Sequence, residues 1–477
     1  MDFISSREED ISKWYLDVVQ NTELADYTAV KGSMIIRPYG FAIWEHIQKE
    51  LDLRIKTLGY QNAYFPLLIP RSFLEKEKDH VKGFSPELTL VTHAGGKELE
   101  EPFVLRPTSE AIMYPIFSKW IQSYRDLPLR LNQWCNIFRW ELRTYPFLRT
   151  TEFLWQEGHS VHSTFEEAQE EALRILETYR TFFEEVLALP VITGYKSEKE
   201  KFPGAWRTHT LEAFLFDGKA LQVGTAHNLG QNFSKVFNIQ FLDASGKQQY
   251  AWQTSWGAST RLIGSLIMVH GDEKGLRLPP KVAPIQVIVV PIWRNEEEFN
   301  RLKDIINTKI ETPLRSINIR VFTDWRERVT PGWKFNDWEL KGVPIRIEIG
   351  PRDIQNNQLI VVQRNRGEKV HIPLDSIKNI ASSLLEEIQL ELLKEAKTFI
   401  NSNIVEIHDF DIFLKMINER RQFFKTSWCG DRDCEDEIKN YSKASIRCIP
   451  LDDQIPSGNC IYCGKPGRFN VFIAQAH

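Results

Sequence analysis

Phe138-Arg139-Trp140-Glu141, which a polar loop connects to Arg149 and Phe153, is one of two segments that decide the fold of this chain. The other is Trp256-Gly257-Ala258-Ser259-Thr260-Arg261, which leads into an apolar run over residues 262–269. Each segment places an arginine beside apolar sequence that is typical of a strand. An arginine fork pairs with phosphate oxygens in a bidentate manner that lysine cannot match. Because an aromatic ring and a carboxylate accompany the two arginines, the segments together predict a site for a nucleoside triphosphate.

Composition limits what the rest of the chain can be. With 477 residues the chain is too long for a single core, so we expect two to four domains. The hydrophobic fraction of 42% is typical of a soluble globular protein, and no apolar run approaches the roughly 20 residues needed to cross a bilayer. The acidic, polar start of the chain does not resemble a signal or transit peptide, so we expect a cytoplasmic protein without membrane contact. The net charge of −4 leaves only a local basic patch for any nucleic-acid binding.

A shift in composition and the apolar periodicity divide the chain into a first mixed region, a small α/β region and a last region. The first mixes a helix that ends near Gly59, strands at 64–70 and 103–105, and a helix opened by a capping box at residues 164–167. A stretch rich in Lys, Leu and Pro at 275–284 is typical of a linker. The second region predicts a small α/β domain, with strands at 287–291, 319–322, 344–350 and 359–363 and helices at 296–311 and 331–341. A long amphipathic stretch over 376–399 leads into the third region.

Two polar points in the first region allow more than one interpretation. Thr108 and Glu110 follow a proline and precede an apolar helix, which is typical of a helix N-terminus with an acidic first turn. The alternative is that Glu110 is a carboxylate that meets a substrate at the helix entrance. His159 and His162 are three residues apart in strand-like sequence, where buried, hydrogen-bonded histidines are a better prediction than a metal pair. Gly224, in a strand of small residues, could admit a close ligand.

Cysteines predict a metal site near the C-terminus. Two spaced pairs, Cys429 with Cys434 and Cys460 with Cys463, fit a tetrahedral Cys₄ zinc site with a structural role. The alternative is four reduced thiols without metal. Cys448 is a fifth candidate ligand, whereas Cys135 stands alone in the first region and is expected to be buried packing.

Several motifs resemble those of the class II aminoacyl-tRNA synthetases. The segment from Gly59 to Leu68 resembles motif 1, which builds the dimer interface of that class, and the two opening segments resemble motifs 2 and 3. Finer matches point to the prolyl-tRNA synthetase family, in the archaeal/eukaryotic-type form with a C-terminal zinc-binding domain. These matches are Arg106 to Glu110, Trp155-Gln156-Glu157-Gly158-His159, Lys201-Phe202-Pro203-Gly204-Ala205, Pro331-Gly332-Trp333-Lys334-Phe335 and Gly350-Pro351-Arg352-Asp353.

The resemblance implies a multi-domain α/β fold. Residues 1–280 would form the catalytic domain with a mixed, mainly antiparallel sheet. Residues 281–382 would form the α/β anticodon-binding domain, and residues 383–477 a small α+β zinc-binding domain. It also implies a homodimer that joins L-proline to tRNA through prolyl-adenylate, using ATP with Mg²⁺.

The same resemblance assigns roles to individual residues. Arg139 and Arg261 would carry the catalytic step by holding the α- and γ-phosphates. The proline site would comprise Thr108, Glu110, Arg139, Trp155, Glu157, Phe202 and His227. The ATP site would comprise Arg139, Glu141, Phe153, Gln222, Thr225, Ser259 and Arg261. The anticodon would meet Phe335, Glu339, Arg346, Arg352 and Asp353, and Zn²⁺ would bind Cys429, Cys434, Cys460 and Cys463.

Departures from the family pattern add two expectations. Bacterial-type members carry a large editing insertion between motifs 2 and 3, whereas about 100 residues separate Phe153 from Ser255 here. Shape alone rejects a smaller amino acid by roughly 1–3 kcal/mol per methylene, so we expect some mischarging with alanine and no hydrolysis of the product in cis. The chain also has histidine at position 477, where the family commonly has tyrosine.

Three rival functions are weighed against this one. A threonyl-type synthetase holds a catalytic zinc with cysteine and histidines, but Cys135 is the only cysteine of the catalytic region. A synthetase-like protein without catalysis often lacks a motif arginine, whereas Arg139 and Arg261 are both present. An enzyme that attaches proline to another acceptor would have no use for an anticodon-like domain.

Overall fold

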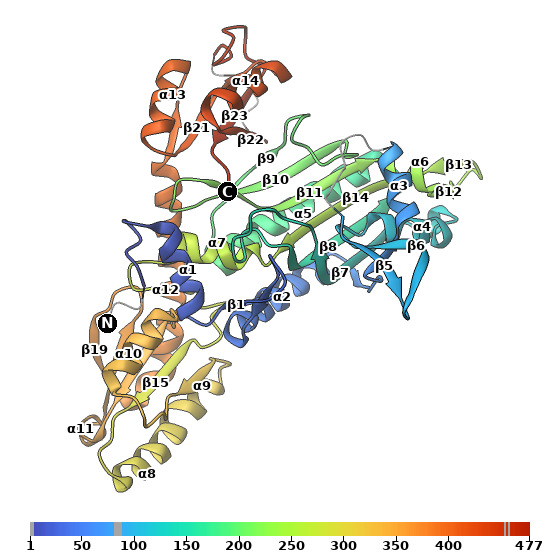
Figure 1. The fold of residues 1–477 in the computed structure, drawn as a ribbon. Helices are drawn as coiled ribbons and strands as arrows, with labels where there is room; N and C mark the ends of the chain where they lie inside the picture. Colours follow the sequence, from blue (N-terminus) through green and yellow to red (C-terminus); the bar gives the residue numbers. More distant parts are fainter. Residues whose placement is uncertain (1–3, 81–87, 453–454, 457) are drawn as a thin grey trace.

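A single large sheet organises the molecule. The computed structural model describes residues 4–80, 88–452, 455–456 and 458–477. The sheet has eleven strands in the order β20-β21-β23-β22-β9-β10-β11-β14-β8-β7-β3 and is antiparallel except for the β3–β7 and β20–β21 pairs (Figure 1). A mixed, mainly antiparallel catalytic sheet is therefore confirmed. Its strands are β3 (Gln61–Asn62), β7 (Leu129–Phe138), β8 (Glu152–His162), β9 (Ile192–Tyr195), β10 (Arg207–Phe214), β11 (Ala220–Gly230), β14 (Trp252–Ser259), β20 (Ile404–Glu406), β21 (Phe423–Trp428), β22 (Ser445–Pro450) and β23 (Phe469–Ala474).

Four helices build the main core against one face of this sheet. They are α1 (Ile11–Asn21), α2 (Pro38–Thr57), α5 (Phe165–Leu187) and α7 (Arg261–His270). The side chain of Thr164 accepts a hydrogen bond from the Glu167 amide at 3.2 Å and so caps α5. The reciprocal half of the predicted capping box is displaced by one residue, because the Glu167 carboxylate accepts from the Ser163 amide at 3.0 Å. Gly59, with a φ of +87°, follows the end of α2 in the left-handed region that glycine tolerates best.

Smaller elements of the catalytic region form separate two- and three-stranded sheets and short helices. The strands are β1 (Ala25–Tyr27), β2 (Met34–Ile36), β4 (Leu68–Pro70), β5 (Leu90–Ala94), β6 (Lys97–Leu105), β12 (Gln240–Leu242) and β13 (Gln248–Tyr250). The helices are α3 (Arg71–His80), α4 (Glu110–Trp120), a short 3₁₀ turn at Tyr124–Asp126 and α6 (Asn232–Phe237). Between motifs 2 and 3 the chain forms α5, α6 and the strands β9 to β13.

A second, five-stranded sheet forms the α/β region predicted for residues 281–382. Its order is β16-β15-β17-β18-β19, with two parallel pairs on the β16 side and two antiparallel pairs on the β19 side. The strands are β15 (Val287–Pro291), β16 (Val321–Thr323), β17 (Ile345–Ile349), β18 (Gln358–Gln363) and β19 (Lys369–Pro373). The helices are α8 (Glu296–Ile305), a π-helical turn at Ile306–Glu311, α9 (Thr312–Arg315), α10 (Pro331–Leu340), α11 (Pro351–Gln355) and a 3₁₀ turn at Leu374–Ser376.

The C-terminal region is joined to the catalytic sheet. The long helix α12 (Ile377–Ser402) leads to it, and it contains α13 (Phe410–Glu419) and α14 (Arg432–Ser442) besides its strands. Because β22 pairs with β9, the eleven-stranded sheet crosses from the catalytic region into the C-terminal one (Figure 1). The boundary that we predicted at residue 383 lies inside α12. The catalytic region and the C-terminal region are joined by backbone hydrogen bonds between β9 and β22.

Several local predictions were wrong for physical reasons. The apolar run at 262–269 is the helix α7, which is buried nearly all round, so its sequence lacks the polar face that distinguishes a helix from a strand. Only Leu68–Pro70 of the strand expected at 64–70 is a strand. The linker at 275–284 is packed rather than exposed, since Leu276 and Val282 belong to the main core. The polar strand β19 was missed altogether.

Candidate active site

A cavity of about 520 Å³ lies over the centre of the large sheet and collects most of the predicted side chains. Every residue assigned to the proline site lies along it, and so does every residue assigned to the ATP site except Glu141. The residues concerned are Thr108, Glu110, Arg139, Phe153, Trp155, Glu157, Phe202, Gln222, Thr225, His227, Ser259 and Arg261. Far-apart segments of sequence thus converge on one concave surface.

Strand register explains this convergence. Alternate residues of β8 point to the same face, so Phe153, Trp155 and Glu157 all line the cavity. Glu157 lies opposite Gly257 on β14, and Gly257 lies opposite Thr225 on β11. A Cβ atom at Gly257 would approach a backbone oxygen at 3.2 Å, so the absence of a side chain there keeps the floor of the cavity open.

The two arginines are held by backbone oxygens rather than by carboxylates. The Nε of Arg139 donates to the carbonyl of Pro107 at 2.8 Å, and its guanidinium lies 5.7 Å from the Phe153 ring and 5.5 Å from the Trp155 ring. Arg261 donates to the carbonyls of Leu148 and Gln222, both at 3.1 Å. Burial, together with the charges of Arg139 and Arg149, lowers the pKa of Arg261 to about 10. Such crowding of positive charge favours an anionic ligand.

Two buried carboxylates face the arginines. The hydroxyl of Thr108 donates to Glu110, which begins α4 as the helix interpretation expects and also lines the cavity. Glu157 accepts from Ser109, from Gln133 at 2.8 Å and from His159 at 3.2 Å. Burial alone would raise the pKa of Glu157, but these hydrogen bonds and the imidazole of His159 outweigh it and hold the pKa below its ordinary value.

An imidazole and a phenyl ring form the opposite wall. The ring of Phe202 lies 4.7 Å from that of His227, whose Nδ1 is 2.9 Å from the hydroxyl of Thr208. Burial, with the nearby His209 and His159, lowers the pKa of His227 to about 3. His227 is therefore neutral at physiological pH, and this side of the cavity combines an apolar surface with an uncharged hydrogen-bonding ring.

Other predicted residues lie elsewhere or point away. Glu141 lies outside the cavity, where its carboxylate is 3.7 Å from the guanidinium of Arg149. Gly224 does line the cavity, and a Cβ atom there would also meet side-chain atoms of Leu211 and Phe183 at 3.2 Å. His162 is buried beside Ser160, while His159 lines the cavity, so the two histidines do not form a pair. Cys135 is half-buried against Trp155, as expected for packing.

Sequence analysis missed part of the lining. Glu200, Lys201, Thr208 and His159 also line the cavity. Thr208 lies directly opposite His227 in the β10–β11 pair, so its place follows once that antiparallel pairing is known. Glu200 and Lys201 lie in an irregular loop, where no periodic signal indicates which side chain turns inward.

Position 477 lies beside the motif 2 loop. The ring of His477 is 5.5 Å from that of Tyr145, and its Nε2 is 3.9 Å from Asp217. These three residues and Arg149 line a separate cavity of about 250 Å³.

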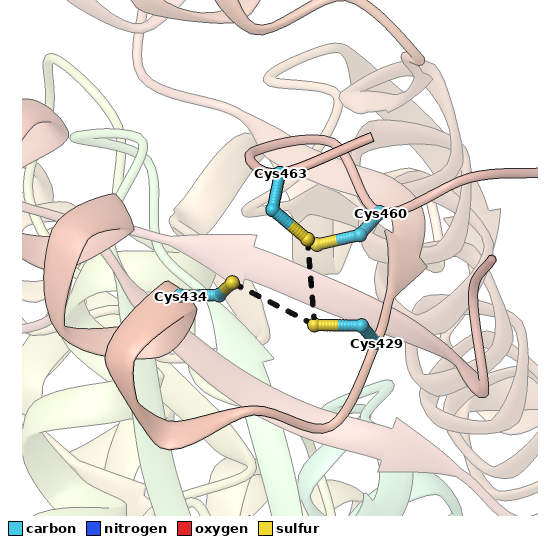
Figure 2. Close-up of side chains that lie close together, drawn as sticks. All are labelled: Cys429, Cys434, Cys460 and Cys463. Carbon is cyan, nitrogen blue, oxygen red and sulfur yellow. Dashed lines mark hydrogen bonds between the residues drawn. The ribbon is translucent and has the colours of Figure 1, made fainter. Parts of the chain in front are cut away.

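The four predicted cysteines form a compact cluster. Their Sγ atoms lie within 4.8 Å of one another, with 3.6 Å between Cys429 and Cys434 and 3.8 Å between Cys429 and Cys463 (Figure 2). Four sulfurs around Zn²⁺, each bound at about 2.3 Å, would be about 3.8 Å apart. The cluster therefore fits a tetrahedral zinc ion, and Cys448 is buried on β22 outside it. Among the described residues this is the one group of three or more Cys, His, Asp and Glu side chains with such spacing.

The five predicted anticodon residues fall into two groups. The guanidinium of Arg346 lies 4.6 Å from the Phe335 ring, beside Glu348 at 3.1 Å, and Glu339 follows one turn after Phe335 on α10. Arg352 and Asp353 lie on α11, beyond the other end of β17. There the Asp353 carboxylate accepts from the Gly350 amide at 2.8 Å. The structure does not bring the two groups together.

Three family models match the chain in order. They are the tRNA synthetase class II core domain (G, H, P, S and T) over residues 91–270, an anticodon binding domain over 286–384 and the prolyl-tRNA synthetase C-terminal domain over 410–477. The proline–tRNA ligase of Natranaerobius thermophilus is 51% identical over 476 residues, which cover 99% of this chain and 98% of that protein. This chain belongs to the proline–tRNA ligase family.

Further comparisons agree with membership in the proline–tRNA ligase family. The proline–tRNA ligase of Borrelia garinii subsp. bavariensis is 50% identical over 486 residues, and the match covers 100% of this chain and 100% of that protein. The crystal structure of prolyl-tRNA synthetase from Cryptosporidium parvum, complexed with halofuginone and AMPPNP, has 44% identity and a TM-score of 0.94 over 100% of this chain and 99% of that one. The class II core, the anticodon-binding domain and the C-terminal domain predicted from sequence are thereby confirmed, and the chain is an aminoacyl-tRNA synthetase. Its match to the prolyl C-terminal domain sets aside the threonyl-type alternative.

Proposed function

We propose that this chain attaches L-proline to tRNA(Pro) in two steps, through prolyl-adenylate. The observation that carries the proposal is the placement of Arg139 and Arg261 on one cavity with Glu110 and with the Phe202–His227 wall. That cavity offers two cations for a triphosphate and a separate carboxylate for the ammonium of an amino acid.

In the first step, a proline carboxylate oxygen attacks the α-phosphorus of ATP and pyrophosphate leaves. Arg139 lies between the aromatic residues of β8 and Glu110, so it can donate to the α-phosphate and to the proline carboxylate. Arg261 would hold the γ-phosphate, and Phe153 would stack on the adenine. Mg²⁺ enters with ATP as part of that substrate. Since Arg139 and Arg261 are held by backbone carbonyls before the substrates arrive, we expect positioning and charge stabilisation to supply the rate enhancement.

The remaining polar groups would complete the nucleotide site. Gln222, Thr225 and Ser259 lie along β11 and the end of β14, where each can reach the bound nucleotide. Glu141 stands outside the cavity and would accept from the adenine amine if the motif 2 loop closes over ATP.

The proline side of the cavity suits a small cyclic secondary amine. Glu110 is a partner for its ammonium, with Thr108 holding the carboxylate in place. Trp155 and Phe202 offer apolar surfaces for the ring. Glu157 is buried behind Trp155 and occupied by internal hydrogen bonds, so we propose that it orders this wall and adds negative charge near the ammonium.

In the second step, a terminal hydroxyl of the tRNA attacks the carbonyl carbon of prolyl-adenylate, the ester forms and AMP leaves. We propose that Arg346, Phe335 and Glu339 meet the anticodon, because a cation stacked on an aromatic ring next to a carboxylate can both donate to and accept from a guanine edge. Arg352 and Asp353 would form a second contact beyond the end of β17.

Zn²⁺ held by the four cysteines would stabilise the C-terminal region.

We also propose that the enzyme is a cytoplasmic homodimer. Motif 1 and the end of α2 before it carry exposed apolar side chains, with Tyr64 72% and Leu53 62% exposed, which would be covered by a second copy. Across the described ranges, no helix is both long and apolar enough to span a membrane.

A further part of the proposal is that mischarged alanyl-tRNA is not hydrolysed by this chain. The residues between Phe153 and Ser255 form strands of the catalytic sheet, α5, α6, a short hairpin and the loops that connect them, which leaves no room for an editing domain there. Alanine fits wherever proline fits, so discrimination rests on lost apolar contact alone.

The test of the proposed function is ATP–pyrophosphate exchange measured with each of the twenty amino acids. We expect strong exchange with proline, weaker exchange with alanine and background with the others. Exchange led by another amino acid, or none from protein that is folded and zinc-loaded, would overturn the proposal.

A further inference from the structure

The wall of the proline side is built on a loop, residues 196–206, that joins β9 to β10. Glu200, Lys201, Phe202 and Pro203 of this loop line the cavity. Its backbone is held at the cavity end by Thr208, whose hydroxyl accepts from the Phe202 amide at 2.9 Å. The position of Phe202 therefore depends on how the rest of the loop is held.

Helix α14 of the C-terminal region holds the other end of this loop. The hydroxyl of Ser197 donates to the Glu435 carboxylate at 2.6 Å, and both residues are almost completely buried. The same hydroxyl accepts from the amide of Glu200 at 3.2 Å, so the contact continues into a residue of the cavity wall.

Two ion pairs extend this contact along the helix. Lys199 pairs with Asp436, and Lys439 lies 3.4 Å from the Glu200 carboxylate. Three loop positions, Ser197, Lys199 and Glu200, thus meet α14 through a buried hydrogen bond and two partly exposed ion pairs. A surface contact of adventitious origin would not include a buried carboxylate with a matched donor.

The start of α14 is itself anchored. Cys434, one of the four clustered cysteines, directly precedes Glu435 and lies in the first turn of the helix (Figure 2). Backbone pairing of Ile449 on β22 with Tyr195 on β9 holds the loop and the C-terminal region in register. The cysteine cluster and the proline wall are therefore separated by two residue contacts, Glu435 to Ser197 and Ser197 to Glu200.

We propose that α14 is a positioning element for the amino-acid site: Glu435 and Asp436 hold the 196–206 loop so that Phe202 is placed against His227. This inference rests on the proposed function, because it assigns the wall to proline. Neither residue touches substrate. They act through Ser197 and Lys199, and their loss should weaken proline binding while the ATP side of the cavity, built from β8, β11 and β14, stays in place.

The test is a pair of matched substitutions followed by steady-state ATP–pyrophosphate exchange. Glu435→Ala and Ser197→Ala should each raise the KM for proline by about three- to tenfold, the loss expected from part of one buried hydrogen bond to a charged group. The KM for ATP and the zinc content should stay near wild type. The double variant should be no worse than either single one, because both remove the same contact. Glu437→Gln is the control, since this carboxylate lies on the same helix but faces Tyr462.

A second pair covers the case in which the buried substitutions unfold the protein. Lys199→Asp and Asp436→Lys are partly exposed, so each single reversal should fold and raise the KM for proline, and the combined swap should restore it. The rate of amide hydrogen exchange over residues 197–204 should rise in each single reversal and return to the wild-type level in the combined swap. The positioning role is overturned if the wild-type enzyme shows proline-dependent ATP–pyrophosphate exchange but these variants leave the KM for proline unchanged. It is also overturned if they raise the KM for proline and the KM for ATP equally. Absence of proline-dependent exchange in the wild type would instead overturn the proposed function.

Discussion

Replacement of Arg139 by alanine is the sharpest test of the catalytic assignment. The side chain has five N–H donors, of which Nε is occupied by the carbonyl of Pro107 at 2.8 Å. Within the described part of the chain, its two terminal nitrogens have no protein acceptor and face the cavity. The guanidinium lies against Phe153 and Trp155, which hold it in place before substrate binds.

The magnitude follows from this geometry. Loss of one preorganised donor at a site of developing charge typically raises the barrier by about 3–4 kcal/mol, a factor of 10²–10³ in rate. We therefore expect Arg139→Ala to lower the single-turnover rate of prolyl-adenylate formation by about that factor. The rate of adenylate formation in Arg139→Lys should lie between those of wild type and Arg139→Ala, because lysine keeps the charge but loses the planar fork.

The assay should separate chemistry from tRNA binding. Adenylate formation is measured by rapid quench with labelled ATP, and tRNA affinity by fluorescence anisotropy on the same preparations. The anticodon-side residues lie on a different sheet, so tRNA affinity should stay within about twofold of wild type for additive, distant sites. An adenylation rate within about threefold of wild type, under 1 kcal/mol of barrier, would refute the catalytic assignment of Arg139.

Four further outcomes are expected. Glu212, which is buried and paired with Lys196 at 2.6 Å and Arg447 at 2.8 Å, has its pKa lowered to about 2 because these cations outweigh the effect of burial. Since that is below the unfolded value of about 4.3, the pairing should contribute stability above pH 5 that is lost as the pH falls toward 2. In urea titrations, the free energy of unfolding should fall more steeply with decreasing pH in wild type than in Glu212→Gln. An equal dependence on pH in the two proteins would contradict this. Cys434→Ser should lose bound zinc by elemental analysis and melt at a lower temperature, whereas full metal content would count against the tetrahedral site. Alanine should support exchange more weakly than proline by about 1–3 kcal/mol per missing methylene, and alanyl-tRNA should persist with the purified chain; its rapid hydrolysis would refute the absence of editing. Arg346→Ala should raise the KM for tRNA without changing exchange, with Arg352→Ala as the comparison on α11; an unchanged tRNA KM in Arg346→Ala would remove it from the anticodon site.

The chemistry of this protein was largely predictable from sequence, because it depends on residue types at short, regular spacing. Arg139, Phe153 and Trp155 lie on or beside one strand, where alternation alone puts side chains on one face. The cysteine pairs are similarly local, and tetrahedral zinc imposes the same spacing in any fold. Local signals such as the cap at Thr164 and the glycine after α2 also held, since they depend on a few neighbouring residues.

Burial and long-range pairing decided the rest. The run at 262–269 became a helix because it is enclosed on nearly all sides, which removes the polar face that a periodic pattern needs. Glu141 was assigned to the ATP site by its motif, yet the loop that carries it places it outside the cavity beside Arg149. Only the tertiary structure joins β22 to β9 and sets α14 against the 196–206 loop, since the residues in contact are more than 230 positions apart in the chain and no local pattern links them. Sequence therefore determined which groups gather at the candidate site, whereas the packing of distant segments decided what holds those groups in place.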